Sequence, residues 1–102
     1  MGKTSAIRSL AKCIGNVVLH KIVLKHTTKP EAVKHLKDEI TDYTSDAFEK
    51  AQLHNWNNKE KEEIKNKAMI RVKNIIKRYP DMDYKESEIN EFIDEIMEEM
   101  LL

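Results

Sequence analysis

The sequence predicts an all-α protein, and both its composition and the spacing of its apolar residues lead to that fold class. Of the 102 residues, 35% are charged and only two are Gly and two are Pro, a composition typical of helical bundles and coiled coils. Apolar residues recur at three- and four-residue steps in four stretches, which is the period of one helix face. We therefore expect a single helical domain over residues 1–102, with helices at about 4–26, 29–55, 58–79 and 84–101.

The first two stretches differ in how clearly they begin. The first carries Lys and Arg between its apolar residues, and Gly15 is its one weak point as a helix. The second opens on Thr28, Pro30 and Glu31, which predicts a capping box with proline in the first turn. The apolar stripes are Ile7, Leu10, Ile14, Val17, Val18, Ile22 and Leu24 in the first, and Val33, Leu36, Ile40, Tyr43, Ala47, Phe48 and Ala51 in the second.

The third and fourth stretches have their own start and stop signals. Asn57 or Asn58 is expected to cap the third, Pro80 ends it, and Asp83 or Ser87 is expected to cap the fourth. Trp56, in the preceding loop, is expected to plug one end of the bundle. The apolar stripes are Ile64, Ala68, Val72, Ile75, Ile76 and Tyr79 in the third, and Ile89, Phe92, Ile93, Ile96, Met97 and Met100 in the fourth.

Short connections between these helices predict an antiparallel up-down four-helix bundle. The net charge is zero, but residues 1–29 hold six basic and no acidic side chains, and residues 80–102 hold one basic and nine acidic. Residues 30–58 are acidic and residues 59–79 basic, so all neighbours in such a bundle have opposite sign, which disfavours wrong pairings. The alternative is a three-helix body from which the long N-terminal helix projects toward a partner.

The chain lacks the residue patterns of enzymatic and metal sites. No histidine has Glu three residues before it, no two histidines are four apart, and there is one cysteine, so neither a di-metal bundle site nor a zinc site is expected. We predict no catalytic residue, no cofactor and no enzyme activity. The longest uncharged runs fall far short of the ~20 residues that a spanning helix requires, so we expect no transmembrane segment.

Two groups of residues are candidates for binding. The first helix has more aliphatic residues than one stripe can hide, which predicts an interface for a partner protein or for self-association. Its residues are Val17, Val18, Leu19, Ile22, Val23 and Leu24. Basic residues on the first and third helices are candidate phosphate contacts, namely Lys21, Lys25, Lys29, Lys73, Lys77 and Arg78.

Residues 45–101 resemble the soluble tail of the phage holin family called LLH. The resemblance rests on Ala47 to Gln52, on the Lys- and Glu-rich run from Lys59 to Glu63, and on the closing apolar pattern, which includes Ala68, Val72, Ile89, Ile93, Met97 and Met100. That family carries an N-terminal membrane span, whereas residues 1–29 here are cationic and interrupted by polar residues, so the resemblance does not extend to pore formation. It implies a phage origin and a helical module used for association.

These observations predict a non-enzymatic helical protein–protein interaction or structural subunit, of the kind found as a phage virion or assembly component. The alternative is a nucleic-acid-associated regulatory factor that uses the basic faces of the first and third helices. A neutral chain without a recognisable nucleic-acid-reading motif favours the first. A single cysteine and no secretion signal predict a cytoplasmic protein, in the host cytoplasm or virion if it is phage-encoded.

Overall fold

The computed structural model describes residues 3–100, and these form four helices. The helices are α1 (Lys3–His26), α2 (Pro30–Gln52), α3 (Asn58–Ile76) and α4 (Glu86–Glu99). The all-α prediction is confirmed, and the helices lie close to their expected positions. The second and third helices both end three residues earlier than expected, at Gln52 and at Ile76, and residue 101 of the fourth predicted helix lies outside the described residues.

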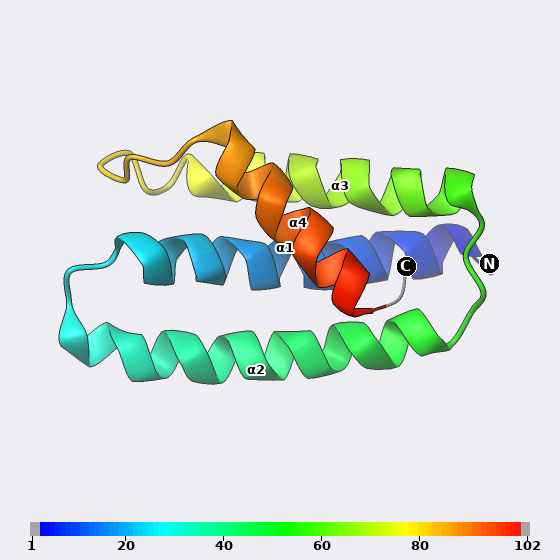
Figure 1. The fold of residues 1–102 in the computed structure, drawn as a ribbon, viewed down its shortest axis with the longest axis horizontal. Coiled ribbons are helices and arrows are strands. Elements are labelled where there is room, and N and C mark those ends of the chain that lie inside the picture. Colours follow the sequence, from blue (N-terminus) through cyan, green and yellow to red (C-terminus); the bar gives the residue numbers. More distant parts are fainter. Residues whose placement is uncertain (1–2, 101–102) are drawn as a thin grey trace.

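The four helices are arranged around α1, which lies between α2 and α3 while α4 crosses it obliquely (Figure 1). Within residues 3–100, α1 packs against all three other helices, α3 also packs against α4, and α2 packs against α1 alone. The expected contact between the second and third helices is therefore not made. A projecting N-terminal helix is not observed either, since α1 is the centre of the bundle.

The central position of α1 explains its excess of aliphatic residues. Eight of its hydrophobic side chains are at most 5% exposed: Ile7, Leu10, Ala11, Ile14, Val17, Val18, Leu19 and Ile22. A helix that packs against neighbours on three sides needs a wide apolar sector. Four of the six residues predicted as an interface, Val17, Val18, Leu19 and Ile22, thus belong to the core of the chain itself, and only Val23 and Leu24 are half-buried. This corrects the expectation that all six lie at a docking surface.

The other helices complete this core unequally. The buried residues of α3 and α4 recur at helical spacing and all but Ala68 are larger than alanine, whereas α2 buries only Ala47 and Ala51 fully. Small side chains allow the backbones of α1 and α2 to approach closely, and the larger residues of α2, such as Ile40 and Phe48, pack at the edge of the core. The apolar residues of α3 and α4 are Ile64, Ala68, Val72 and Ile76, and Ile89, Ile93, Ile96 and Met97.

Only one of the three predicted helix caps is formed. The Asn57 side chain accepts the backbone N–H of Glu60 at 2.8 Å, and the Glu60 carboxylate accepts the backbone N–H of Asn57 at 2.9 Å, a complete capping box. The N-cap residues of α2 and α4 are Lys29 and Lys85, and neither makes a side-chain capping bond, so the predicted caps there were wrong. Proline in the first turn of α2 and acidic residues in the first turn of α4 favour these helix starts instead.

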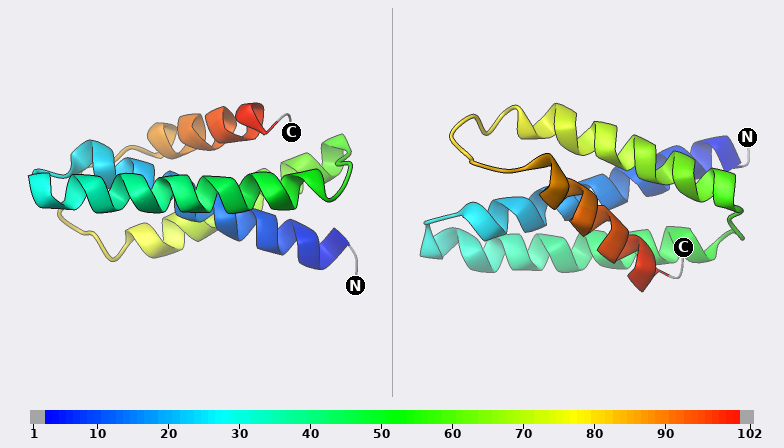
Figure 2. Two further views of the ribbon diagram at one scale, coloured as in Figure 1. Left: turned by 90° about the horizontal axis from the view of Figure 1, so that it is seen from below. Right: turned by 45° about the horizontal axis from the view of Figure 1, so that its top comes forward.

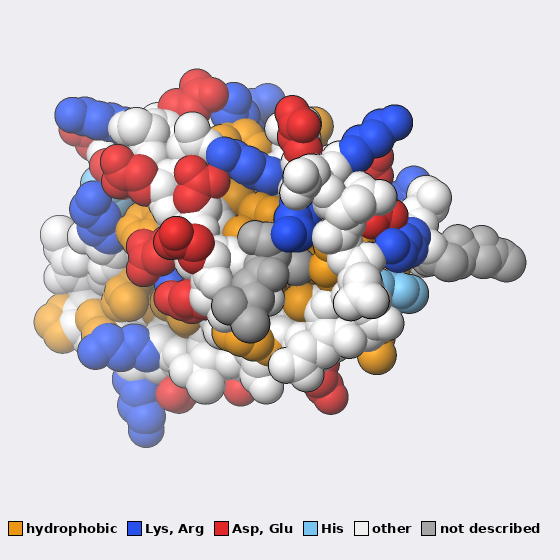
Figure 3. Space-filling model, turned by 45° about the vertical axis from the view of Figure 1, so that its right-hand side comes forward, with side chains coloured by type: hydrophobic (Ala, Val, Ile, Leu, Met, Phe, Trp, Pro, Cys, Tyr) orange, Lys and Arg blue, Asp and Glu red, His pale blue; other side chains and the backbone are white. Residues whose placement is uncertain are grey.

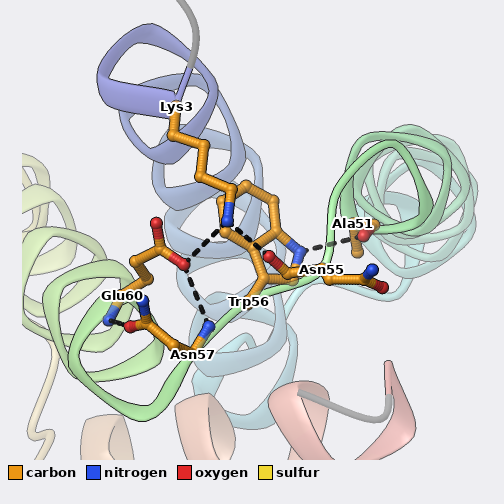
Figure 4. Close-up of polar contacts among 6 residues, drawn as sticks. All are labelled: Lys3, Ala51, Asn55, Trp56, Asn57 and Glu60. Carbon is orange, nitrogen blue, oxygen red and sulfur yellow. Dashed lines mark hydrogen bonds and ion pairs between the residues drawn. The ribbon is translucent and has the colours of Figure 1, made fainter.

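The α2–α3 connection is tied to the start of α1 through Lys3 (Figure 4). The Lys3 ammonium donates to the backbone carbonyl of Asn55 at 2.6 Å and to Glu60 at 3.0 Å, and it lies 5.8 Å from the centre of the Trp56 ring. The Trp56 indole N–H donates to the carbonyl of Ala51 at 2.9 Å. The half-buried Trp56 packs against the core, at the end of the bundle where the sequence placed it.

Candidate functional site

The basic residues of α3 are divided between two flanks of that helix. Lys65 and Lys73 point to the α4 side, where they form ion pairs with Asp94 at 2.8 Å and with Glu86 at 2.6 Å. Lys67 lies about 200° around the helix from Lys65, because each residue turns the chain by about 100°. It therefore lies on the flank away from α4.

On that flank, α1 and α3 enclose an open groove of about 430 Å³. Four of the seven residues that line it are cationic and none is acidic: Arg8, Ala11 and Lys12 from α1, and Lys67, Ile70, Arg71 and Asn74 from α3. We call this the basic groove. Among the ion pairs within residues 3–100, none involves any of its four cations. None of these four cations is thus paired within 4 Å with a carboxylate of the described chain.

Gly15 shapes the wall of the basic groove, because it lets Arg71 lie directly across α1. A Cβ atom added at Gly15 would lie 2.7 Å from Cγ and 3.0 Å from Cβ of Arg71, closer than such atoms normally approach. The Arg71 side chain is half-buried, and one guanidinium Nη atom approaches the amide oxygen of Asn16 at 3.5 Å. Its Nε atom is buried and has no hydrogen-bond partner. Packing against a glycine therefore holds this guanidinium in the groove.

Ile70 adds an apolar element to the basic groove. Its side chain is 57% exposed, one of three large hydrophobic residues that are clearly exposed among those described. A single exposed aliphatic residue is ordinary on a protein surface. An exposed isoleucine among four cations, in a groove, is the combination that protein interfaces use, with apolar contact inside a charged rim.

The acidic counterpart of the basic groove lies along the outer side of α2. Asp42, Asp46 and Glu49 are exposed, follow one another at four- and three-residue steps, and appear in none of the ion pairs within residues 3–100. The same stripe continues to Leu53, which is 73% exposed. We call Asp42, Asp46, Glu49 and Leu53 the acidic stripe. Earlier in α2, Glu39 instead contacts His20 of α1 and His35 of its own helix.

The six candidate phosphate contacts do not form one surface. Lys25 pairs with Glu88 at 3.7 Å and Lys73 with Glu86, so both lysines face carboxylates in the first turn of α4. Lys29 and Arg78 line a different cavity, of about 710 Å³, between the α1–α2 and α3–α4 connections. Lys77 is exposed and Lys21 is half-buried. The structure instead brings together the four cations of the basic groove. In the sequence they are recognisable as two pairs four residues apart, Arg8 with Lys12 and Lys67 with Arg71.

On the α4 side, the Glu88 carboxylate is paired with basic residues of α1. Glu88 accepts a hydrogen bond from the His26 ring at 3.0 Å, and this bond, with the nearby Lys25 ammonium, lowers the pKa of the Glu88 carboxyl below its usual value. Near α2, burial raises the pKa of the half-buried Cys13 thiol.

Among residues 3–100 no three His, Cys, Asp or Glu side chains are placed to hold a metal ion. In the same part of the chain, no helix has the length and apolar character to cross a bilayer.

Comparison of the chain with family models, with curated proteins and with solved structures found no match. The resemblance of residues 45–101 to the holin tail therefore stays a prediction. The basic groove combines four cations that make no ion pair among the described residues with an exposed isoleucine.

Proposed function

We propose that this protein is a non-enzymatic helical interaction subunit that binds an acidic protein surface in the basic groove between α1 and α3. The observation that carries this proposal is the exposed Ile70 among Arg8, Lys12, Lys67 and Arg71. Unbalanced charge speeds and orients the approach of an oppositely charged partner, while the apolar residue contributes affinity once water is displaced.

An acidic helix suits the groove better than a phosphate backbone does. Phosphate contacts are made by Lys, Arg and other N–H donors, so a nucleic acid would leave the Ile70 side chain in water. An amphipathic helix with carboxylates beside an aliphatic residue would satisfy the cations and cover Ile70 together. The walls of the groove are two helices, a form that accepts a third helix by ordinary helix packing.

Nucleic-acid binding is the second candidate, because no acidic side chain lines the groove. Its cations are arranged as two pairs, each with one helical turn between its members. Such binding would release counterions, so its affinity would fall steeply between ~50 and ~200 mM salt. The phage assignment is a further proposal that rests on the resemblance alone, and sequencing the neighbouring genes would test it.

The experiment that tests the proposal is a titration of isotope-labelled protein followed by amide NMR shifts. The probes are a synthetic amphipathic helix that carries Glu on one face and Leu at its edge, and a random 20-base-pair duplex. We expect the peptide to shift the amides of Lys12, Lys67 and Ile70 and to bind more tightly than the duplex at about 150 mM salt.

Matched variants make the result specific to the groove. Lys12→Gln with Lys67→Gln should weaken peptide binding about tenfold or more, whereas Lys59→Gln, which removes one exposed charge outside the groove, should have little effect. If neither the peptide nor the duplex shifts groove amides at a protein concentration at which the chain is monomeric, the proposal is wrong. If only the duplex does so, the second candidate function replaces it.

A further inference from the structure

One side of α1 is covered by α4, and the opposite side carries no helix among the described residues. Figure 2 shows α4 on one side of the other three helices. On α1, Gly15 faces Ala68 and Arg71 of α3, and Cys13 faces α2. Helical geometry then places Ser9 and Asn16 between these two directions, on the side away from α4. We call this side, with the adjoining flanks of α2 and α3, the open face.

The open face has edges of opposite charge. Its α3 edge is the basic groove and its α2 edge is the acidic stripe. The two edges flank the same turns of α1: Asn16 is contacted by Arg71, and the charges that act on Cys13 come from Lys12, Asp46 and Lys50. Between the edges, α1 presents Ser9 and Asn16, whose small polar side chains leave room for another helix to approach.

These edges are complementary to a second copy of the chain. A twofold axis that runs parallel to α1 along the open face would place the α3 edge of each copy against the α2 edge of the other, at the same level. A twofold interface makes every contact twice, so two sets of opposite charges would meet. An axis perpendicular to α1 within that face would instead bring α3 against α3, which places like charges together.

We propose that the chain forms a parallel twofold dimer through the open face, with Lys12 and Lys67 of each copy facing Asp46 and Glu49 of the other. This inference rests on the proposed function, since the acidic protein surface that the groove binds is then the acidic stripe of a second copy. The stripe supplies what the groove requires, carboxylates at helical spacing together with an exposed aliphatic residue, Leu53.

The other acidic surface of the chain fits the groove less well. Glu91, Glu95 and Glu98 on α4 are exposed, and Figure 3, a view that includes α4, shows acidic side chains gathered near the C-terminal end. That surface lies on the opposite side of α1 from the groove. Pairing of the two would be head-to-tail and would extend into open chains rather than close into a dimer. Among the described residues of α4, none is an exposed large aliphatic.

Charge-swap variants of the full chain test the dimer. One variant carries Lys12→Glu and Lys67→Glu, and the other carries Asp46→Lys and Glu49→Lys. Each alone places like charges together at both contacts, so dimerisation should weaken more than about tenfold. In a mixture of the two, one contact is native and the other is reversed but complementary, so heterodimers should form. Circular dichroism should show the helical content of the parent in each variant.

Sedimentation velocity at about 50 mM salt is the measurement, with Lys85→Glu and Glu95→Lys, at the start of α4 and within it, as controls outside the open face. We expect the parent and both controls to dimerise, each charge-swap variant to be monomeric, and their mixture to dimerise. A parent that stays monomeric up to about 1 mM overturns the dimer. A variant that still dimerises alone, or a mixture that stays monomeric, overturns the proposed pairing.

The binding of an acidic surface in the groove can be tested separately from the dimer. The Asp46→Lys, Glu49→Lys variant keeps its basic groove, and the acidic peptide can be titrated onto it whether or not the parent dimerises. Peptide shifts at Lys67 and Ile70 with a monomeric parent would support the groove and overturn the dimer. No peptide shifts in this variant would overturn the groove itself.

Discussion

The two sides of α1 differ in whether their basic residues are paired with carboxylates of neighbouring helices. On the α4 side, basic residues of α1 and α3 meet carboxylates, as in the pairs of Lys25 with Glu88 and Lys65 with Asp94. On the open face, Arg8, Lys12, Lys67 and Arg71 meet none among the described residues. The comparison teaches that zero net charge says little about binding, because the flank on which a lysine lies decides whether it is neutralised.

The two sides also differ in what stabilises them. Exposed ion pairs contribute roughly 0–1 kcal/mol each. The ion pairs of α4 therefore affect the orientation of this helix more than its stability. Its attachment comes from Ile89, Ile93 and Ile96, which are fully buried, and burying an aliphatic side chain contributes about 1.5–3 kcal/mol. The charged residues of the basic groove and the acidic stripe make no ion pairs among the described residues, and Ile70 and Leu53 are exposed. The open face therefore contributes little to the fold and is available for a partner.

The largest expected effect compares an isoleucine on each side. Ile93→Asp places an unpaired carboxylate in the core and should cost about 4 kcal/mol or more, a large part of the stability of a small domain. Ile70→Asp, at a site 57% exposed, should change stability by about 0.5 kcal/mol or less. Thermal melting followed by circular dichroism measures both, at a concentration low enough to keep the chain monomeric. Equal effects would mean that α4 is not packed as described.

A smaller effect is expected at Gly15, where the wall of the open face depends on a missing side chain. Alanine there would gain about 1 kcal/mol in helix propensity, but its Cβ would approach Arg71 to within 2.7 Å, and overpacking costs about 1–3 kcal/mol. We expect Gly15→Ala to be destabilising by about 1 kcal/mol in urea unfolding. In an Arg71→Ala background, which removes the contact with Cγ at 2.7 Å and keeps the one with Cβ at 3.0 Å, the same change should cost less. A stabilising effect with Arg71 present would show that the close contact carries no cost.

The smallest effect concerns acid pH on the α4 side. Because the hydrogen bond from His26 lowers the pKa of Glu88 in the folded chain, this carboxylate stabilises the fold above its unfolded pKa of about 4.3. The contribution is lost as the pH falls through the lower, folded pKa. Glu88→Gln should therefore make unfolding free energy less dependent on pH below about 5. An unchanged dependence in urea unfolding from pH 3 to 5 would contradict the role of Glu88.

The sequence predicted local features well and the contacts between helices less well. Asn57 and Glu60 form a capping box because both partners lie within one turn, so their spacing is sufficient information. The neighbours of α2 could not be predicted in this way, since a stripe shows that a helix packs but not against which helix. The same limit applies to Val18 and Ile22. They belong to a helix with more aliphatic residues than one stripe holds, and such a helix is either central in the bundle or part of an interface.

The basic groove was only partly predictable, for a related reason. Lys65, Lys67, Arg71 and Lys73 all lie on one basic helix, and only the position of α4 separates the paired lysines from those in the groove. The contribution of Gly15 depends on a contact with a residue 56 positions away in the sequence. No local pattern indicates that the weakest helix former in α1 allows an arginine of α3 to cross it.

The central claim is that the open face meets its own copy across a twofold axis parallel to α1. Residues on that axis must face their equivalents, so cysteine cross-linking of single positions tests it most directly. In a Cys13→Ser background, Ser9→Cys lies on the open face and Ser87→Cys, exposed in α4, lies on the other side. We predict rapid disulfide-linked dimers from Ser9→Cys under mild oxidation and none from Ser87→Cys at the same concentration. Cross-linking of Ser87→Cys alone, or of neither, would contradict the account.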